Sequence, residues 1–305
     1  MSTILVNIEE LTLDNGIIGF VILNYNSNED TIKLARSLST YDITAGIQII
    51  DNASLQSCKD IEELCMHNSS RIHFKRMDTN LGYARGNNAG ASELLRWLDC
   101  PILAIANPDI DVSSKALHSC VDALLADDEC AAIAPVMLRS SDGRPTYPWR
   151  LPSKKSLLSH TLPLIGKYFS KKDAYSEEKF VNGGICQVDV LPGSLLLIKS
   201  KDFKDVGGFN EETFLYGEEK LLSGRLISRG KTIAFDTTSN YSHCVSSSIN
   251  INIPSIIKRF DYMRDSNDVY AREYLHAGIA YRVLYRILSF VSTRIIAISL
   301  SLKRV

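Results

Sequence analysis

The stretch PILAIANPDIDV, residues 101–112, is a short apolar run that ends abruptly in polar residues. The apolar part has the length and composition of a strand buried inside a sheet. It stops at Asn107-Pro108-Asp109, and a second carboxylate follows at Asp111. These carboxylates are either solvated loop residues or ligands for something charged at the end of the strand.

The chain on both sides of this stretch alternates buried strands with amphipathic helices. Strands are predicted at 16–26, 46–54, 71–77, 101–107 and 130–138. Helices are predicted at 28–41, 55–68, 83–98 and 113–127. This alternation predicts an α/β fold with a parallel sheet and helices on both faces.

Polar motifs follow three of the predicted strands, at Asn24-Tyr25-Asn26, Asp51-Asn52-Ala53-Ser54 and Asn107-Pro108-Asp109. Ligands of open α/β sheets bind at the carboxyl ends of the strands. Because all three motifs fall at such ends, we expect them to line one ligand crevice. This favours the ligand interpretation of the carboxylates after residue 106.

The second half of the chain has a different organisation. Residues 139–182 are loop-rich and basic, and strand character returns at 185–200, where Pro192-Gly193 interrupts it. Residues 206–230 read as a turn, an aromatic-acidic loop and a helix, and 231–248 as a strand and a polar loop. Residues 254–302 have helical patterns.

Composition excludes several classes of protein. The chain has 305 residues, of which 45% are hydrophobic and 23% charged, and a formal net charge of −1, so no basic surface for nucleic acid is expected. Seven scattered cysteines favour reduced thiols. We expect no signal peptide and no membrane span, because the first residues are acidic and no uncharged apolar run reaches about 18 residues. We therefore expect a cytoplasmic protein, at most peripheral on the inner face of the membrane.

Seven motifs occur in an order that resembles the family 2 inverting glycosyltransferases. They are VILNYN, DNAS, NLGYARGNNAG, NPDI, PGSLLLIKS, VGGFNEETFLYGEE and a later histidine, within residues 17–245. The sequence is most similar to the rhamnosyltransferase-type members of bacterial polysaccharide and O-antigen assembly. The resemblance implies a GT-A fold, which is a mostly parallel sheet flanked by helices with a Rossmann-like nucleotide-binding half.

The resemblance also implies a division of the chain and a reaction. Residues 1–248 are the expected GT-A domain, with a nucleotide-sugar-binding half at 17–138 and an acceptor and catalytic half at 139–248; residues 249–305 form a helical extension. The implied donor is dTDP-rhamnose or a UDP-sugar, with rhamnose favoured. The implied acceptor is a lipid-diphosphate-linked glycan.

A divalent cation is implied because a diphosphate leaving group gains negative charge, which Mg²⁺ or Mn²⁺ neutralises. Asn107-Pro108-Asp109 matches the family's aspartate-any-aspartate motif, which makes Asp109 the expected metal ligand. Asp111 is the alternative, although it also suits the start of the following helix. His243 is the second expected ligand, or a contact to the diphosphate.

An inverting transfer needs one general base, and a carboxylate fits that role. FLYGEE matches the family's aromatic-Glu-Asp block, whose second acid is the base and corresponds to Glu219. Here Glu replaces the usual Asp, and Leu221 stands where a further acid is common. These departures leave Glu218 open as the base.

The nucleotide-sugar site follows from the positions of the other motifs. Asp51 is expected to hydrogen-bond the pyrimidine ring, and the glycines after residue 80 let the backbone approach the ligand. The full expected set is Asn24, Tyr25, Asn26, Asp51, Asn52, Asn80, Gly82, Asn87, Asn88, Asn107, Gly193 and Ser194.

The C-terminal segment 279–304 has no acidic residue but several arginines. A polar stripe runs along the predicted helix, and apolar residues lie away from it. The stripe comprises Arg282, Arg286, Ser289 and Thr293, and the apolar set Ile279, Val283, Ile287, Phe290 and Val291. Such a helix suits an anionic membrane surface, or packing on the domain or in a homodimer.

Two other functions are compatible with parts of the sequence. Sugar nucleotidyltransferases carry a glycine-rich loop after the first strand, where this chain has NYNSNED without glycine. A catalytically decayed binding or scaffold protein is suggested by the departures at Glu219 and Leu221.

Overall fold

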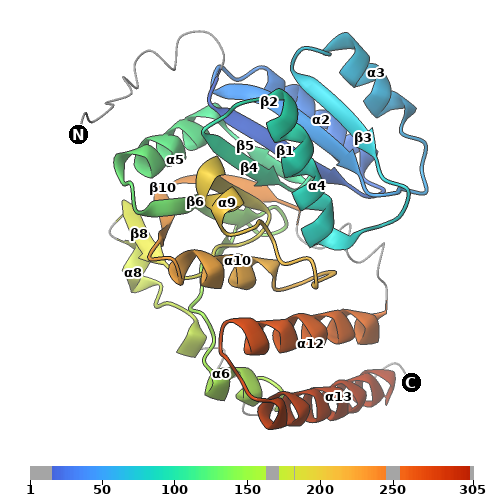
Figure 1. The fold of residues 1–305 in the computed structure, drawn as a ribbon, viewed down its shortest axis with the longest axis vertical. Helices are drawn as coiled ribbons and strands as arrows, with labels where there is room; N and C mark the ends of the chain where they lie inside the picture. Colours follow the sequence, from blue (N-terminus) through green and yellow to red (C-terminus); the bar gives the residue numbers. More distant parts are fainter. Residues whose placement is uncertain (1–15, 163–171, 182, 245–254, 303–305) are drawn as a thin grey trace.

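The structure of the chain is a computed structural model that describes residues 16–162, 172–181, 183–244 and 255–302. One sheet of ten strands forms its centre, in the order β3-β2-β1-β4-β9-β6-β10-β5, with β7 beside β6 and β8 beside β10 (Figure 1). The strands are β1 (Ile18–Asn24), β2 (Thr44–Asp51), β3 (Ile72–Arg76), β4 (Ile102–Ala106), β5 (Ile110–Val112), β6 (Cys130–Arg139), β7 (Pro145–Thr146), β8 (Ile185–Val188), β9 (Leu195–Lys199) and β10 (Thr232–His243).

The predicted α/β fold is confirmed, and the pairing of the strands is more mixed than the sequence indicates. Strands β1 to β4 pair in parallel, and β6 pairs in parallel with β10. Strand β9 lies antiparallel to both β4 and β6, because the chain enters it from a loop and not from a helical crossover. The strand character predicted at 185–200 is confirmed as two strands, β8 and β9, on either side of the predicted interruption at Pro192-Gly193.

Helices cover both faces of the sheet, as the alternating pattern predicts. They are α2 (Asn28–Ser39), α3 (Lys59–His67), α4 (Gly82–Trp97), α5 (Ser114–Ala126), α6 (Lys154–Ser159), α8 (Glu178–Val181), α9 (Ser200–Asp205), α10 (Glu218–Ile227), α12 (Ile256–Glu273) and α13 (Ile279–Leu302).

Side chains of β1 alternate between two cores, which explains why this strand is apolar throughout. Phe20 and Ile22 pack with α2, α3 and α5 on one face, whereas Val21 packs with α4, α9 and α10 on the other. A third, smaller cluster joins α6, α10, α12 and α13, and Leu221 is one of its buried members. The apolar residue in the acidic motif therefore packs against the C-terminal helices.

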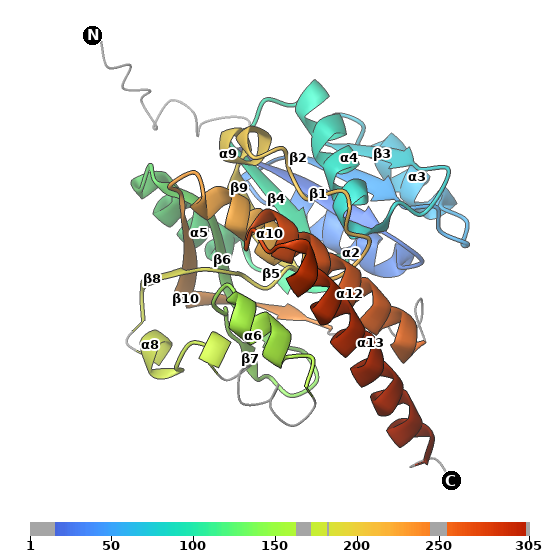
Figure 2. The ribbon, with the colours of Figure 1, turned by 60° about the horizontal axis from the view of Figure 1, so that its bottom comes forward.

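The predicted helical segment 254–302 forms two antiparallel helices, α12 and α13. The connection between them includes His276, whose φ of 48° reverses the chain. Both helices lie beneath α10, on the side away from α5 (Figure 1), and α13 runs along α12 to the C-terminus (Figure 2). Residues 139–162 and 172–181 form the irregular excursion that the sequence predicts, and the predicted stretch 163–171 lies outside the described residues.

Candidate active site at the carboxyl ends of the strands

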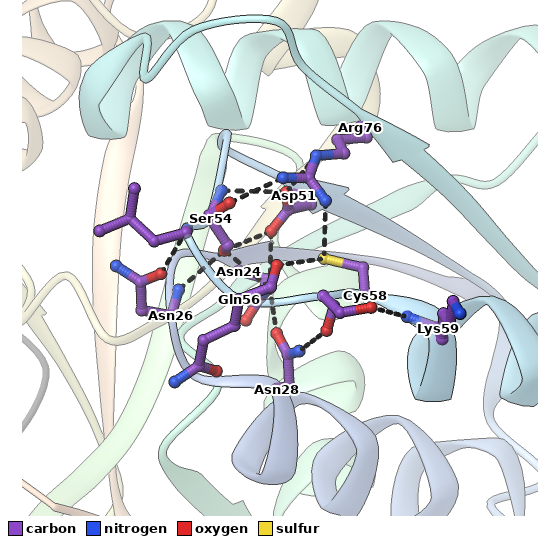
Figure 3. Close-up of polar contacts among 11 residues, drawn as sticks. Asn24, Asn26, Asn28, Asp51, Ser54, Gln56, Cys58, Lys59 and Arg76 are labelled. Carbon is purple, nitrogen blue, oxygen red and sulfur yellow. Dashed lines mark hydrogen bonds and ion pairs between the residues drawn. The ribbon is translucent and has the colours of Figure 1, made fainter.

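A buried polar network ties together the ends of β1 and β2, where Asn24 and Asp51 are register partners (Figure 3). Asn24 Nδ2 donates to Asp51 Oδ1 at 2.8 Å, and the backbone N–H of Ser54 donates to Asp51 Oδ2 at 3.1 Å. Arg76 Nε lies 3.4 Å from the same oxygen. Both Asn24 and Asp51 are fully buried, so this carboxylate shapes the strand ends, and its contact with a pyrimidine ring stays a prediction.

The two loops that follow these strands adopt uncommon backbone conformations. Asn26 and Ala53 have φ values of 56° and 60°, in the left-handed region. Ser54 Oγ accepts from the backbone N–H of Asn26 at 2.8 Å, and Asn26 Oδ1 accepts from that of Leu55 at 2.7 Å. Left-handed non-glycine residues cost about 1–3 kcal/mol each and gather at functional sites. The loops are thus held in a fixed shape at the edge of the expected crevice.

A second set of contacts joins the start of α4 to the loop before α10. Asn52 Nδ2 donates to Asn80 Oδ1 at 3.0 Å, and Gly82 N–H donates to the same oxygen at 2.9 Å. Gly82 has a φ of 79°, and a Cβ there would lie 2.8 Å from Cδ2 of Phe214. This glycine therefore lets the first residue of α4 lie directly against Phe214 in the loop before α10.

The two asparagines of α4 have different surroundings. The side chain of Asn88 binds another part of the protein: Nδ2 donates to the carbonyl of Phe209, and Oδ1 accepts from the N–H of Phe209, both at 2.9 Å. Its role is to hold the loop before α10. Asn87 is buried and donates to the carbonyl of Tyr83 at 3.0 Å, while Oδ1 has no partner among the described residues.

Asp109 and His243 lie together, as the motif order predicts. Strand β5 pairs antiparallel with β10, and this brings His243 Nε2 to 3.2 Å from Asp109 Oδ1. Both side chains are almost buried, and His243 Nδ1 has no hydrogen-bond partner in the described part of the chain. Asp111 is exposed between buried Ile110 and Val112, and in the pairing of β5 with β10 it lies opposite Ser242 and not opposite His243.

The pair supplies a carboxylate and an imidazole, both common ligands of divalent cations. Within the described residues no three His, Cys, Asp or Glu side chains converge on one point. A carboxylate oxygen and an imidazole Nε2 that lie 3.2 Å apart fit a cation that takes its other ligands from a diphosphate and water. His243 Nδ1, the other ring nitrogen, is not part of this candidate ligand set. The preference for Asp109 over Asp111 as a metal ligand stays a prediction, and the structure places Asp109 Oδ1 3.2 Å from His243 Nε2.

Glu218 and Glu219 begin α10, directly after Gly217, whose φ is 85°. Glu218 is buried, and its Oε1 has no partner within the described ranges. Burial, and then the neighbouring Glu219, raise the pKa of Glu218 to about 8. Burial also raises the pKa of Glu219. Two adjacent carboxyls in a desolvated site hold their protons more tightly than either would in water.

Glu219 lies against Gly193, as predicted, and the glycine is needed there. A Cβ on Gly193 would lie 2.7 Å from Glu219 Cγ and 2.8 Å from Cδ. Ser194 faces elsewhere: its hydroxyl is buried 2.7 Å from the hydroxyl of Tyr241. The carbonyl of Ser194 accepts from Asn107 N–H at 2.8 Å. The pair Gly193-Ser194 therefore connects the strand end before Asp109 to the carboxylate of Glu219.

Tyr83 is a site residue that the sequence analysis missed. Its hydroxyl donates to the carbonyl of Gly193 at 2.6 Å, and it lines the narrow apolar cavity that Gly193 and Glu219 also line. Burial raises the pKa of Tyr83 well above its ordinary value, and the charges of Glu219 and Glu218 add to this. The sequence signal that could have identified Tyr83 is an aromatic residue directly after Asn-Leu-Gly at the start of a predicted helix.

No family model matches the chain. It is 24% identical over 212 residues to a low-salt glycan biosynthesis hexosyltransferase, Agl10, of Haloferax volcanii, covering 70% of this chain and 61% of that protein. It is 27% identical over 162 residues to an N-acetylglucosaminyl-diphospho-decaprenol L-rhamnosyltransferase of Mycobacterium tuberculosis, covering 50% and 52%. The chain thus spans less than two thirds of the length of these curated relatives.

Solved glycosyltransferase structures share the fold. GalNAc-T7 with UDP, GalNAc and Mn²⁺ matches with a TM-score of 0.57 and 15% identity, over 75% of this chain and 44% of that one. A Pyrobaculum calidifontis mannosyltransferase, PcManGT, with GDP-Man and Mn²⁺ matches at 0.57 and 11%, over 92% and 73%. Staphylococcus aureus TarS with UDP matches at 0.54 and 14%, over 87% and 68%. The architecture is therefore that of the GT-A glycosyltransferases.

Proposed function

We propose that this chain, a GT-A-fold relative of the family 2 glycosyltransferases, moves a sugar from a nucleotide-diphosphate donor to a glycan acceptor with inversion at the anomeric carbon. In this proposal residues 17–138 bind the donor, 139–248 supply the base and the acceptor side, and 249–305 are a helical extension. The observation that carries the proposal is the Gly193-Ser194 link: the carbonyl of Ser194 accepts from Asn107, two residues before Asp109, and Gly193 contacts Glu219.

Glu219 is the proposed general base. The acceptor hydroxyl gives its proton to the Glu219 carboxylate while the acceptor oxygen bonds to the anomeric carbon. The bond from that carbon to the diphosphate breaks, and its electron pair leaves with the nucleoside diphosphate. Glu219 is preferred over Glu218 because it contacts Gly193 and lines the cavity beside it. Burial raises the pKa of both carboxyls, so their pKa values do not separate the two.

Asp109 and His243 are the proposed metal ligands. A divalent cation such as Mg²⁺ or Mn²⁺, when bound there, neutralises negative charge on the diphosphate. The Mn²⁺ named with two of the similar structures supports a divalent cation in general. The protein's own part is to hold the carboxylate and the imidazole side by side at the edge of the sheet.

The donor and acceptor are proposed from the relatives. The M. tuberculosis relative is named for L-rhamnose transfer to a decaprenol-linked diphospho-sugar, which favours dTDP-rhamnose and a lipid-linked acceptor. UDP-sugars stay as the alternative, since TarS is described with UDP.

The test compares Glu219→Gln with Glu218→Gln in a transfer assay that follows release of the nucleoside diphosphate and the mass of the product. Loss of a general base costs about 10²- to 10⁴-fold in turnover. We expect that loss for Glu219→Gln with donor affinity retained, and turnover within a few-fold of wild type for Glu218→Gln. The reverse pattern would make Glu218 the base, and two active variants would contradict the mechanism.

The outer face of α13 is the proposed contact with a lipid bilayer, and the contacts of its arginines decide which stripe of the helix faces the protein. Arg282 donates two hydrogen bonds to Asp268 at 2.7 and 2.8 Å, and Arg286 lies 3.0 Å from Asp265, so the basic stripe packs against α12. The residues turned outward are apolar instead. They are Ile279, Val283, Leu284, Ile287, Phe290, Val291 and Ile295, each at least 46% exposed.

Helix α13 carries arginines and no acidic residue, and Arg294 lies over the exposed ring of Phe290 at 4.8 Å. An apolar face with a cation beside it and no anion matches the surface of an anionic bilayer. No helix in the described ranges is long and apolar enough to cross a membrane. We therefore propose that α13 lies along the bilayer that carries the acceptor.

A further inference from the structure

One side chain in the loop before α10 makes none of the contacts that its neighbours make. Tyr216 has a φ of 72°, in the left-handed region that a bulky residue rarely adopts. Among the described residues its hydroxyl forms no hydrogen bond and its ring no aromatic contact, and it belongs to none of the three apolar clusters. Packing within the described chain therefore explains neither the strained backbone nor the half-buried ring.

The loop around Tyr216 is held from two sides, which is the condition under which a strained residue persists. On the α4 side, the N–H of Tyr83 donates to the carbonyl of Phe214 at 2.9 Å. On the α12 side, the ring of Tyr262 stacks on the ring of Phe214, with centroids 4.8 Å apart. The protein thus fixes the backbone just before Tyr216 and gives the Tyr216 ring itself no partner in the described ranges.

Tyr216 also lies beside the proposed base. It comes two residues before Glu218 and three before Glu219 in the same loop and helix start. Burial raises the pKa of Tyr216, while the charge of Arg259 in the first turn of α12 lowers it and that of Glu218 raises it. Charges act in this way over a few ångströms, so the phenol lies near the starts of both α10 and α12. An acceptor whose hydroxyl reaches Glu219 must therefore lie close to this ring.

We propose that Tyr216 is the platform on which the ring of the acceptor sugar lies while one of its hydroxyls faces Glu219. Since an acceptor is needed only by a transferase, this assignment rests on the proposed function. One face of a sugar ring is lined by C–H groups that pack on an aromatic face, and a phenol O–H bonds hydroxyls at the edge. A left-handed φ places the Cβ on a different side of the backbone from an ordinary φ, so the strained conformation selects where the ring lies.

A purely structural role does not account for a tyrosine at this position. Glycine adopts a left-handed φ without steric strain, and Gly217, with a φ of 85°, does so at the next position. Tyrosine here lowers stability and gains no apolar packing within the described protein. A bound sugar ring supplies the contact that the folded chain leaves out.

The experiment measures binding of one probe, N-acetylglucosaminyl diphosphate with an octyl tail, by calorimetry and saturation-transfer NMR. Wild type is compared with Tyr216→Phe, which keeps the ring, and with Tyr216→Gly, which removes the ring and relieves the left-handed strain. His276→Gly is the matched control, because His276 is a left-handed residue with a φ of 48° in the connection between α12 and α13. Thermal unfolding of all four proteins is measured alongside.

Tyr216→Gly should weaken probe binding at least about tenfold, whereas Tyr216→Phe should stay within about threefold of wild type and His276→Gly should match it. Neither glycine variant should unfold at a lower temperature than wild type, because the strain that glycine removes offsets the freedom that it gives the unfolded chain. Equal binding by wild type and Tyr216→Gly, or no binding by wild type, would overturn the platform. An equal loss in Tyr216→Phe, or a large fall in the unfolding temperature of Tyr216→Gly, would overturn it too.

Transfer from dTDP-rhamnose to the same probe is measured separately, so the two proposals fail in different ways. A wild type that binds the probe through Tyr216 but releases no nucleoside diphosphate would refute the transferase proposal alone. An unchanged acceptor KM in an active Tyr216→Gly variant would refute the platform alone. Donor KM should stay within about twofold of wild type in every variant, since the ring touches only the acceptor in this account.

Discussion

Replacing Gly193 with alanine places a methyl group where the proposed base now lies. The new Cβ would be 2.7 Å from Glu219 Cγ, whereas carbon atoms pack at about 3.5–4.0 Å. Gly193 has no left-handed φ, so alanine fits the backbone, and the strain falls on the Glu219 side chain. The carboxylate must therefore move by about 1 Å.

A misplacement of about 1 Å in a catalytic group costs on the order of 10²-fold in rate, which corresponds to about 2.7 kcal/mol in the activation barrier. Overpacking of this kind costs about 1–3 kcal/mol in stability, and the lower end applies because the end of the glutamate side chain is flexible. We expect Gly193→Ala to remain folded and to bind donor normally while its turnover falls about a hundredfold.

The assay measures kcat and KM for the donor, together with the thermal unfolding midpoint. Gly278→Ala is the matched control, because a Cβ there meets nothing within 4 Å and its φ is not positive. Shortening the base to aspartate in the double variant with Glu219→Asp gives room for the new methyl group. The double variant should therefore lose less than the two single losses combined. Turnover of Gly193→Ala within about twofold of wild type would refute the placement of Glu219 as the base.

Three further predictions concern neighbouring groups. Between about pH 4.5 and about 8 the folded protein holds a proton on Glu218 that the unfolded chain has lost, so the free energy of unfolding should fall as pH rises through this window. Urea titrations of Glu218→Gln should show a flatter dependence of this free energy on pH. An unchanged dependence would contradict the raised pKa of Glu218. Tyr83→Phe removes the 2.6 Å hydrogen bond to the Gly193 carbonyl, so we expect the free energy of unfolding to fall by about 1 kcal/mol and kcat to fall several-fold. An unaltered kcat, in a protein whose unfolding measured by calorimetry is also unaltered, would argue against the contact. The double variant Ile287→Glu/Phe290→Glu should bind anionic vesicles at least about tenfold more weakly in a co-sedimentation assay, whereas Met66→Glu, on the exposed face of α3, should bind as wild type does. Equal vesicle binding by all three proteins would contradict the bilayer contact. A wild-type dimer that the double variant dissociates would also contradict it.

The sequence predicts the α/β fold well because the signals are local. An apolar run such as that of β4 is a buried strand in any parallel sheet, and acidic first turns mark helix starts such as that of α2. The antiparallel position of β9 between β4 and β6 cannot be predicted from local sequence, because it depends on how strands far apart in the sequence pair.

The site shows the same division between local and long-range information. Asp109 and His243 lie where the motif order places them, because β5 and β10 pair. The hydrogen bonds of Asn88 and Ser194 are absent from the prediction because their partners, Phe209 and Tyr241, are remote in the sequence.

Helix α13 shows a limit of periodicity. The pattern correctly separates a polar stripe from an apolar one, but it does not determine which stripe faces the protein. The acids that bind the arginines belong to α12, and they turn the polar stripe inward. What the structure adds is therefore that the apolar stripe of α13 is the exposed one.

Calorimetry with Mn²⁺ and a panel of donors tests the central claim most directly. The panel is dTDP-rhamnose, UDP-glucose, UDP-galactose, UDP-galactofuranose and UDP-N-acetylglucosamine, and the proteins are wild type, Asp109→Ala and Asp111→Ala. We predict that wild type and Asp111→Ala bind one donor in a manner that requires Mn²⁺, and that Asp109→Ala does not, because only Asp109 lies beside His243. Equal binding by all three proteins, or no binding of any donor with or without the metal, would contradict a metal-assisted sugar transfer at this strand end.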